Sequence, residues 1–411
     1  MALHQGRTAS FTLLLDIAYA FEVVFDASVY ELPRGRELYG RSLQMRLIPI
    51  LLLLSALILS ACASRPPALL VPISAQPSGA KNIDVLAIST RAPSDVEGEI
   101  YSGERGDGLS AHIVDISIPP THRLGYLEAP SSKTPKPEKE FAVRHIEAAE
   151  PERAWQWFDE QNSGGRLLIF VHGYRVRFAD AVFRLSQVAH DSGIKTAPVL
   201  FTWPSRGKLF SYFYDRESAN FSRDALELIL AEAVARDSVS EITLLAHSMG
   251  SWLTMEALRQ TSIRNGTISP KIRDVVLASP DLDLDVFDQQ IKAMGDERPH
   301  FTFLVSEDDK ALGISKFLAG GQHRLGAINP LKEPYRSRIE NTQGITVVDL
   351  SEVDTEGGTT HSKFAATEAM TMLGAQMKNG RPSILETPSR IGQHAGAVIV
   401  SLGNGVAQIS E

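Results

Sequence analysis

The chain has 411 residues, of which 22% are charged and 43% hydrophobic, and its formal net charge is −8 at pH 7. This length allows one large domain or two modest ones of ordinary globular composition. The negative balance and the lack of a basic stripe argue against a nucleic-acid partner, because such proteins neutralise phosphates with clustered Lys and Arg.

The first clear signature is an apolar run from Leu47 to Leu59, which follows Met45 and Arg46. The run is shorter than the roughly 20 residues that span a bilayer, and it suits the core of a signal peptide. It leads into Leu-Ser-Ala-Cys, which resembles a bacterial lipobox with Cys62, the only cysteine, as the lipidated residue. The alternative is a free or buried cysteine behind an ordinary signal peptide. By the same resemblance, Ala63 instead of Asp after the cysteine permits transfer to an outer membrane in a host that has one.

Residues 1–44 stand ahead of this signal, and their apolar patch carries Asp16 and Glu22, which disfavours a spanning helix. We therefore expect translation to start at Met45. A stretch rich in Pro, Ala and Ser follows the signal and is expected to be a tether. The expected organisation is a mis-assigned extension (1–44), a signal peptide (45–61), a tether (62–79), a globular domain (80–378) and a C-terminal tail (379–411) whose role stays open.

Within the globular domain, strand-like apolar runs alternate with helical patterns. The expected strands are Ile83–Thr90, Ala111–Pro119, Phe141–Ile146, Leu167–His172, Pro198–Trp203, Ile242–His247, Val275–Ser279, Phe301–Ser306 and Ile345–Leu350. The expected helices are 148–161, 179–190, 223–236, 252–264 and 286–294. This alternation predicts an α/β fold with a mostly parallel sheet and helices on both faces. Ligands of such sheets bind at the carboxyl ends of the strands.

A candidate nucleophile follows the strand Ile242–His247. Ser248 lies between Ala246 and Gly250, with a helical pattern directly behind it. Small-x-Ser-x-Gly also occurs by chance, but a strand that turns at once into a helix is the context of a nucleophile elbow. We therefore expect the Ser248 hydroxyl to stand above the sheet edge.

The expected strand Leu167–His172 leads into Gly173 and Tyr174. Enzymes with a nucleophile elbow place half of their oxyanion hole after a strand in this position. The backbone amides of Tyr174 and Met249 are the candidate donors. His172 is expected to be a structural histidine and not a base.

A serine nucleophile needs a base and an orienting carboxylate, in the chain order Ser, acid, His. His361, in the loop after the last expected strand, fits this order. The acid is expected after the strand Phe301–Ser306, where Asp308 and Asp309 both fit, and Asp281 is a second candidate. Weaker alternatives for the base are His300, His323 and His394.

No metal or cofactor is expected. Asp281, Asp283 and Asp285 have the spacing that opens a calcium loop, but Val286 stands in place of the required Gly and Lys292 in place of the final Glu. No run of His and Cys has the spacing of a zinc site, and no phosphate-binding loop is present.

Together these stretches resemble the bacterial α/β-hydrolase family catalogued as a domain of unknown function in the esterase/lipase superfamily. The motifs are IFVHGY, LFTWPS, YDRESAN, LLAHSMGSWL, LASPDLDLDVF, SEDDKALGIS and the late His361, and they extend over Ile83 to Met377. The resemblance implies the α/β-hydrolase fold, with Asp309 as triad acid because it precedes a basic residue, Ala and Leu. Arg175-Val176-Arg177 departs from the Asn-rich sequence that is usual in the family.

The expected function is therefore a serine hydrolase that cleaves carboxylic esters or thioesters through an acyl-enzyme. Ser248, His361 and Asp309 would form its triad. Trp203 and Tyr212 are candidates for the substrate pocket, with ordinary packing as an equal alternative. A lipase acting on long acyl chains is a second enzyme hypothesis, and a non-catalytic binding module of the envelope is the alternative from another class. The expected partners are an ester substrate and, through the lipid anchor, a bacterial envelope membrane.

Overall fold

The structure is a computed structural model that describes residues 70–161, 163–318, 324–340, 342, 344–353, 359–367, 369–371, 373–374 and 398–402. The chain divides into two compact units, Met1–Arg65 and Pro66–Glu411. The first unit, with the expected extension, signal peptide and Cys62, lies outside the described residues. Within the described ranges, no helix combines the length and the apolar character needed to cross a bilayer.

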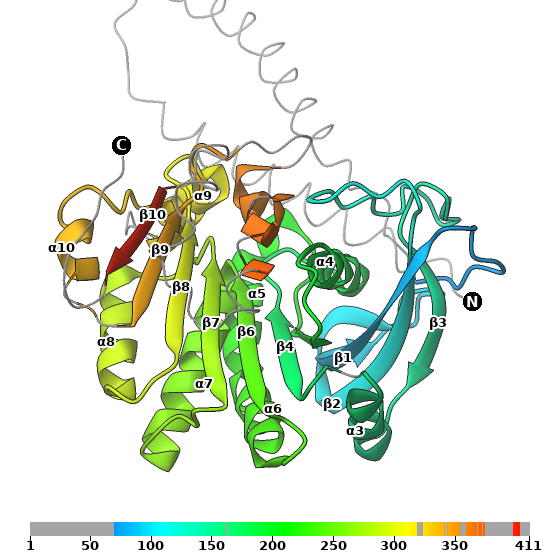
Figure 1. The fold of residues 1–411 in the computed structure, drawn as a ribbon, viewed down its shortest axis with the longest axis horizontal. Coiled ribbons are helices and arrows are strands. Elements are labelled where there is room, and N and C mark those ends of the chain that lie inside the picture. The colour runs from blue at the N-terminus through cyan, green and yellow to red at the C-terminus, as the bar shows by residue number, and fades with distance from the viewer. Residues whose placement is uncertain are drawn as a thin grey trace, which may run out of the picture. The chain divides into compact units, whose positions relative to one another are not determined.

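A ten-stranded sheet forms the centre of the second unit, in the order β10-β9-β8-β7-β6-β4-β5-β1-β2-β3 (Figure 1). From β9 to β1 all neighbouring strands are parallel, while β2, β3 and β10 join through antiparallel pairs. The strands are β1 (Lys81–Pro93), β2 (Tyr101–Ile118), β3 (Ala142–Ala148), β4 (Arg166–Val171), β5 (Ala197–Thr202), β6 (Glu241–His247), β7 (Ile272–Ala278), β8 (His300–Val305), β9 (Ile345–Asp349) and β10 (Val398–Leu402). The mostly parallel α/β sheet predicted from the sequence is confirmed.

Helices cover both faces of this sheet (Figure 1). They are α3 (Pro151–Glu160), α4 (Phe178–Asp191), α5 (Tyr212–Phe221), α6 (Arg223–Ala235), α7 (Met249–Asn265), α8 (Leu284–Met294), α9 (Lys310–Leu318) and α10 (Tyr335–Glu340), with short 3-10 turns η1 (Leu209–Ser211), η2 (Leu325–Ala327) and η3 (Thr360–Ala365). One apolar cluster joins α3, α6, α7 and α8 to one face, and a second joins α4 and residues 364–373 to the other.

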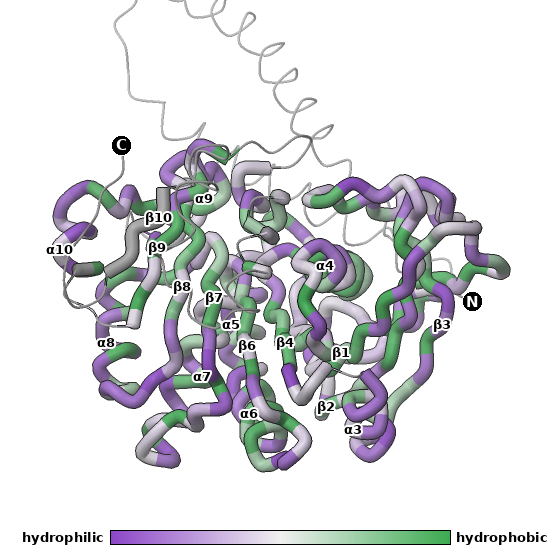
Figure 2. The backbone as a smooth tube through the Cα atoms, viewed as in Figure 1, coloured by the Kyte–Doolittle hydropathy of each residue, from purple (hydrophilic) through white to green (hydrophobic). Residues whose placement is uncertain are grey.

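The central strands are apolar along their whole length because both of their faces are covered. In β4, Leu167, Ile169 and Val171 belong to the first cluster, whereas Leu168 and Phe170 belong to the second. Figure 2 shows the same strands as mostly green, hydrophobic segments between the helices. The two-residue period therefore fixes which side chain enters which core.

The packed domain begins earlier than residue 80. Leu70 is buried, and its amide donates to the carbonyl of Gly98 at 3.0 Å. The amide of Ile73 donates to the carbonyl of Val143 in β3 at 2.8 Å. The expected tether, 62–79, is therefore wrong for its last part, because Leu70 is buried and the backbone at Ile73 pairs with β3, the edge strand of the sheet. In the expected tail, β10 adds a strand beside β9.

Candidate active site

Ser248 stands at the sharp turn between β6 and α7, with φ 53° and ψ −121°. Its amide donates to the carbonyl of Ala278 at 2.9 Å, and its carbonyl accepts from the amide of Asp281 at 3.2 Å. A Cβ at Gly250 would lie 2.4 Å from the carbonyl oxygen of His172, so the helix can pass this close to β4 only with glycine there. The turn therefore has the strained strand-to-helix geometry that a nucleophile elbow requires.

Strained backbone gathers at the carboxyl ends of the parallel strands. Among the described residues, the non-glycine residues with positive φ are Arg175 after β4, Ser248 after β6 and Ser279 after β7. Such conformations cost about 1–3 kcal/mol each and persist where the surroundings enforce them, which is common at functional sites.

The loop after β4 lies against the serine. A Cβ at Gly173 would come within 2.9 Å of the Ser248 Cβ, so the backbone leading to Tyr174 touches the nucleophile turn. On the other side, Met249 is the first residue of α7, and its amide has no acceptor within the helix. The two candidate oxyanion donors therefore belong to the two segments that adjoin Ser248.

Asp215 of α5 holds this loop. The carboxylate is buried and accepts hydrogen bonds from the Arg175 amide at 3.1 Å, the Ser205 hydroxyl at 2.5 Å and the Arg206 amide at 3.1 Å. It thus ties the positive-φ residue after β4 to the loop after β5.

His172 is a structural histidine by its contacts, as the sequence analysis expected. Its Nδ1 lies 2.9 Å from the carbonyl oxygen of Gly173, and its Nε2 accepts from the Trp203 amide at 3.2 Å. The Trp203 indole stacks on the imidazole and donates to the His172 carbonyl at 2.9 Å. Trp203 is fully buried, so its contacts are those of packing and not of a pocket wall.

Arg91, at the end of β1, connects the same loops. It reaches Nε2 of His172 at 3.1 Å and donates to the Thr202 hydroxyl at 2.7 Å. It also donates to the carbonyl oxygens of Ser102, Val176 and Ser205. Burial lowers the pKa of Arg91 to about 9, so the guanidinium stays charged at neutral pH.

The sequence analysis gave no role to Arg91 or Asp215. The available signals were an arginine near the end of the first strand and an aspartate in the YDRESAN motif. Neither signal shows which residues Arg91 and Asp215 contact, because their hydrogen-bond partners lie in or after other strands.

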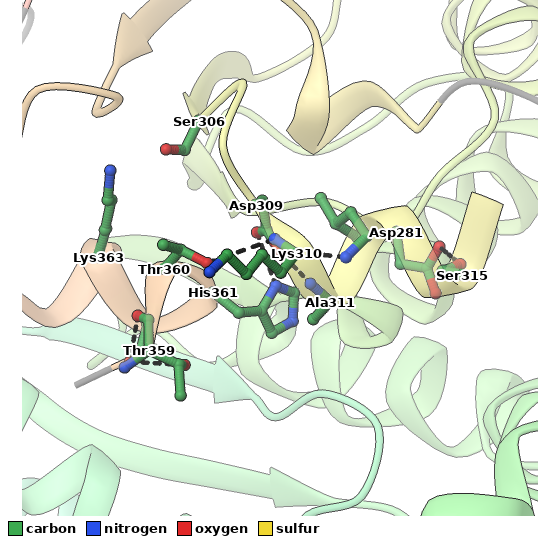
Figure 3. A network of polar contacts seen from close by, with 12 residues as sticks. Asp281, Ser306, Asp309, Lys310, Ala311, Ser315, Thr359, Thr360, His361 and Lys363 are labelled. Atoms are coloured by element: carbon green, nitrogen blue, oxygen red, sulfur yellow. Dashed lines mark hydrogen bonds and ion pairs between the residues drawn. The ribbon is translucent and has the colours of Figure 1, made fainter. Parts of the chain in front are cut away.

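His361 and Asp309 are joined directly (Figure 3). His361 Nδ1 lies 2.7 Å from Asp309 Oδ2, and the Asp309 side chain is fully buried. The other oxygen, Oδ1, accepts from the amides of Ala311 at 3.0 Å and Leu312 at 3.1 Å, which caps the N-terminus of α9. Because Asp309 occupies Nδ1, Nε2 is the nitrogen that His361 has left for a nucleophile.

His361 lies beside the turn that carries the serine. His247, the residue before Ser248, places its Nε2 3.1 Å from the His361 carbonyl oxygen, and the two imidazole rings are 4.6 Å apart. The segment that carries His361 and its partner Asp309 therefore packs against the residue that precedes Ser248.

The neighbouring aspartate has a different partner. Asp308 pairs with Lys363, whose Nζ lies 2.9 Å and 3.0 Å from the two carboxylate oxygens. Partial burial alone would raise the pKa of Asp308, but hydrogen bonds from Ser306 and Lys363 bring it below its ordinary value. Of the two adjacent candidates, only Asp309 is bonded to His361.

Asp281, the second candidate acid, lies in another cluster. Its carboxylate accepts from the Tyr212 hydroxyl at 2.9 Å and the Ser315 hydroxyl at 2.5 Å, and Arg324 lies 3.1 Å away. All of these side chains are buried, and Figure 3 shows Asp281 beside Ser315. Tyr212 therefore joins α5 to α9, and this hydrogen-bonded packing is its observed role.

Of the three alternative bases, His300 is the one that the structure describes. His300 Nε2 lies 2.9 Å from the Thr346 hydroxyl in β9. His323 and His394 lie outside the described residues.

The two histidines nearest the turn predict how stability depends on pH. Burial and then the charge of Arg91 lower the pKa of His172 well below its ordinary value, and burial and then His361 do the same for His247. Both imidazoles are neutral in the folded protein, whereas in the unfolded chain they titrate with a pKa of about 6.5. Their contribution to the free energy of unfolding is therefore fully present above that pH and is lost as the pH falls below it. We expect the free energy of unfolding to fall from about pH 7.5 to about pH 5, and His172→Asn to flatten this slope.

Urea unfolding at several pH values measures this slope. His145→Asn is the matched control, because that side chain is 67% exposed. A slope that His172→Asn leaves unchanged contradicts the assignment of His172 as a buried neutral imidazole.

Comparison with known proteins identifies a family whose model matches this chain. Residues 150–380 match the model of a family described as alpha/beta hydrolase of unknown function (DUF900). Among solved structures, a lipase-esterase related protein from Clostridium acetobutylicum ATCC 824 is similar to this chain at 12% sequence identity and a TM-score of 0.30. The match covers 53% of this chain and 95% of that protein. A protein described as a cell surface hydrolase from Lactobacillus plantarum WCFS1 has 8% identity, covers 57% and 98%, and has a TM-score of 0.34. No curated protein matches the chain. The family match spans more than half of the sequence, and the chain belongs to this α/β-hydrolase family.

Proposed function

We propose that the protein is a serine hydrolase that cleaves carboxylic esters or thioesters through an acyl-enzyme. The observation that supports this most strongly is the 2.7 Å contact between His361 Nδ1 and Asp309 Oδ2 beside the strained turn of Ser248. A buried carboxylate on one imidazole nitrogen makes the other nitrogen a base for the serine hydroxyl.

In the proposed reaction, Ser248 Oγ attacks the carbonyl carbon of the ester while Nε2 of His361 takes the hydroxyl proton. Asp309 stabilises the imidazolium that forms. The amides of Tyr174 and Met249 donate to the negative oxygen, and each such donor contributes about 3 kcal/mol to the transition state. The tetrahedral species then expels the alcohol or thiol, which receives its proton from His361. Water attacks the acyl-enzyme by the same route and releases the acid.

We also propose that the protein starts at Met45 and is anchored through a lipid on Cys62 in the bacterial envelope, facing the periplasm from the outer membrane. The support for this part is the sequence alone: a short apolar run, the lipobox-like ending and the sole cysteine. The substrate would then be a small or lipid ester that reaches the envelope.

A fluorophosphonate probe tests the nucleophile. We expect the wild-type protein to be labelled and Ser248→Ala to lose the label completely, since the probe reacts with an activated serine. Ser251→Ala is the control, because this nearby buried hydroxyl only donates to the Ala246 carbonyl. Labelling that survives in Ser248→Ala, or a folded wild type that stays unlabelled, would falsify the proposed nucleophile.

The adjacent aspartates provide a matched pair for the acid. Asp309→Asn can still cap α9, but its amide nitrogen cannot accept the hydrogen bond from Nδ1 of His361, so we expect kcat to fall roughly 10³–10⁴-fold. Asp308→Asn retains an oxygen for Lys363 and should stay within about tenfold of wild type. Kinetics on a series of esters of increasing chain length give both numbers and separate a small-ester esterase from a lipase. Equal losses in the two variants contradict the assignment.

The anchor has its own test. In a bacterial host fed a labelled fatty acid, we expect the protein to carry the label and to sediment with membranes, and Cys62→Ser to lose both. Intact mass or N-terminal sequencing of the precursor checks the start at Met45. Membrane association that Cys62→Ser leaves intact, or a precursor that contains residues 1–44, would rule out this part of the proposal.

A further inference from the structure

A second cluster of chemically active side chains lies where the loop after β2 meets the C-terminal end of α4. His122 comes from the loop, and His190 and Asp191 are the last two residues of the helix. Their potential ligand atoms all lie within 4.8 Å of one another, and each residue is partly buried. We propose that these three residues bind a divalent transition-metal ion and that zinc is the ion that fits them best. This inference is independent of the proposed hydrolase function.

The groups around the cluster orient the three residues as metal ligands are usually oriented. Nδ1 of His122 lies 2.7 Å from the Glu128 carboxylate, which leaves Nε2 directed at Asp191. In Asp191, Oδ2 accepts from the Gly125 amide at 2.9 Å and from the Gln187 side chain at 3.0 Å, which leaves Oδ1 facing His122. A histidine whose second nitrogen meets a carboxylate, beside a ligand carboxylate that is itself hydrogen-bonded, is the arrangement that supports metal ligands in proteins.

The donor set selects the class of ion. Two imidazole nitrogens and one carboxylate oxygen suit zinc and similar ions, with water as a fourth ligand, whereas calcium and magnesium prefer oxygen ligands throughout. His122 Nε2 and Asp191 Oδ1 are 2.8 Å apart, a distance at which a shared proton joins them. Zinc bonds of about 2.0–2.1 Å in a tetrahedron require about 3.3 Å between ligand atoms, so a small rotation of side chains would replace the proton by the metal.

His190 needs the larger adjustment. Its ring centroid lies 5.4 Å from that of His122, with the planes inclined at 62°. Both rings can turn about their side-chain torsions, which are broad for histidine. The sequence analysis found no metal site because 69 residues separate His122 from Asp191 along the chain.

The proposed ion would join two segments, and hydrogen bonds tie both of them to a third. Gln187, which orients Asp191, also donates to the Ala365 carbonyl in η3 at 3.2 Å. The Thr367 hydroxyl donates to the Leu124 carbonyl, in the same loop as His122, at 2.8 Å. A bound ion would therefore fasten the loop after β2 to α4, the two segments that already contact the segment after His361.

Zinc titration of the full-length protein, purified in detergent and stripped of metal with a chelator, tests the site. We expect binding of one zinc per chain in competition with a chromophoric chelator, a rise in Tm on binding, and a cobalt spectrum typical of four-coordinate nitrogen and oxygen ligands. Glu128→Gln should weaken binding about 10–100-fold, because it alters only the residue that orients His122. His190→Ala should weaken it at least as much.

His145→Ala is the matched control, because this exposed histidine lies 3.8 Å from the Glu147 carboxylate outside the cluster. It should bind zinc as the wild type does. Three outcomes would overturn the proposal: no stoichiometric binding by the wild type, equal binding by His190→Ala and the wild type, or equal losses in His190→Ala and His145→Ala. If His190→Ala fails to fold, the cobalt spectrum of the wild type and the Glu128→Gln affinity still decide the question.

Discussion

The two oxygens of the Asp309 carboxylate do different work, and the candidate site depends on both. One oxygen caps the first turn of α9, and the other holds Nδ1 of His361. Because the side chain is fully buried, water does not compete for either contact. A single group therefore fixes the position of α9 and sets which nitrogen of the imidazole carries the proton. If it were lost, the histidine would have no defined orientation toward Ser248.

The serine side of the site depends on strain that other residues must offset. Positive φ at Ser248 and at Arg175 costs about 1–3 kcal/mol each. Asp215 binds the Arg175 amide and the loop after β5, while Arg91 bridges the same loops from β1 through His172. Removing one of these buried partners is costly, because the charged group that remains is left with an unsatisfied hydrogen bond. The loop after β4, which lies against the Ser248 turn, is thus held in place by residues of β1 and α5.

The sequence predicted what is local. A strand that becomes a helix at Ser248 is a contiguous signal, and the position of His361 follows from chain order. The choice between Asp308 and Asp309 was open on the residues themselves, because it depends on the start of α9, a short helix that the apolar pattern did not reveal. Arg91 and the cluster around His122 were missed for another reason. Their partners lie on other strands and helices, and no spacing along one segment encodes such a meeting. Leu70 was assigned to a tether because proline-rich composition outweighed its apolar side chain.

The central claim is that a serine, an imidazole and two backbone amides converge on one reacting carbon. A crystal structure of the protein after reaction with a phosphonate ester tests it most directly, because the adduct mimics the tetrahedral intermediate. The account predicts phosphorus bonded to Ser248 Oγ, with one phosphonyl oxygen at about 3 Å from the amides of Tyr174 and Met249 and with Nε2 of His361 facing the ester oxygens. Phosphorus on another residue, or a phosphonyl oxygen turned away from both amides, would contradict it.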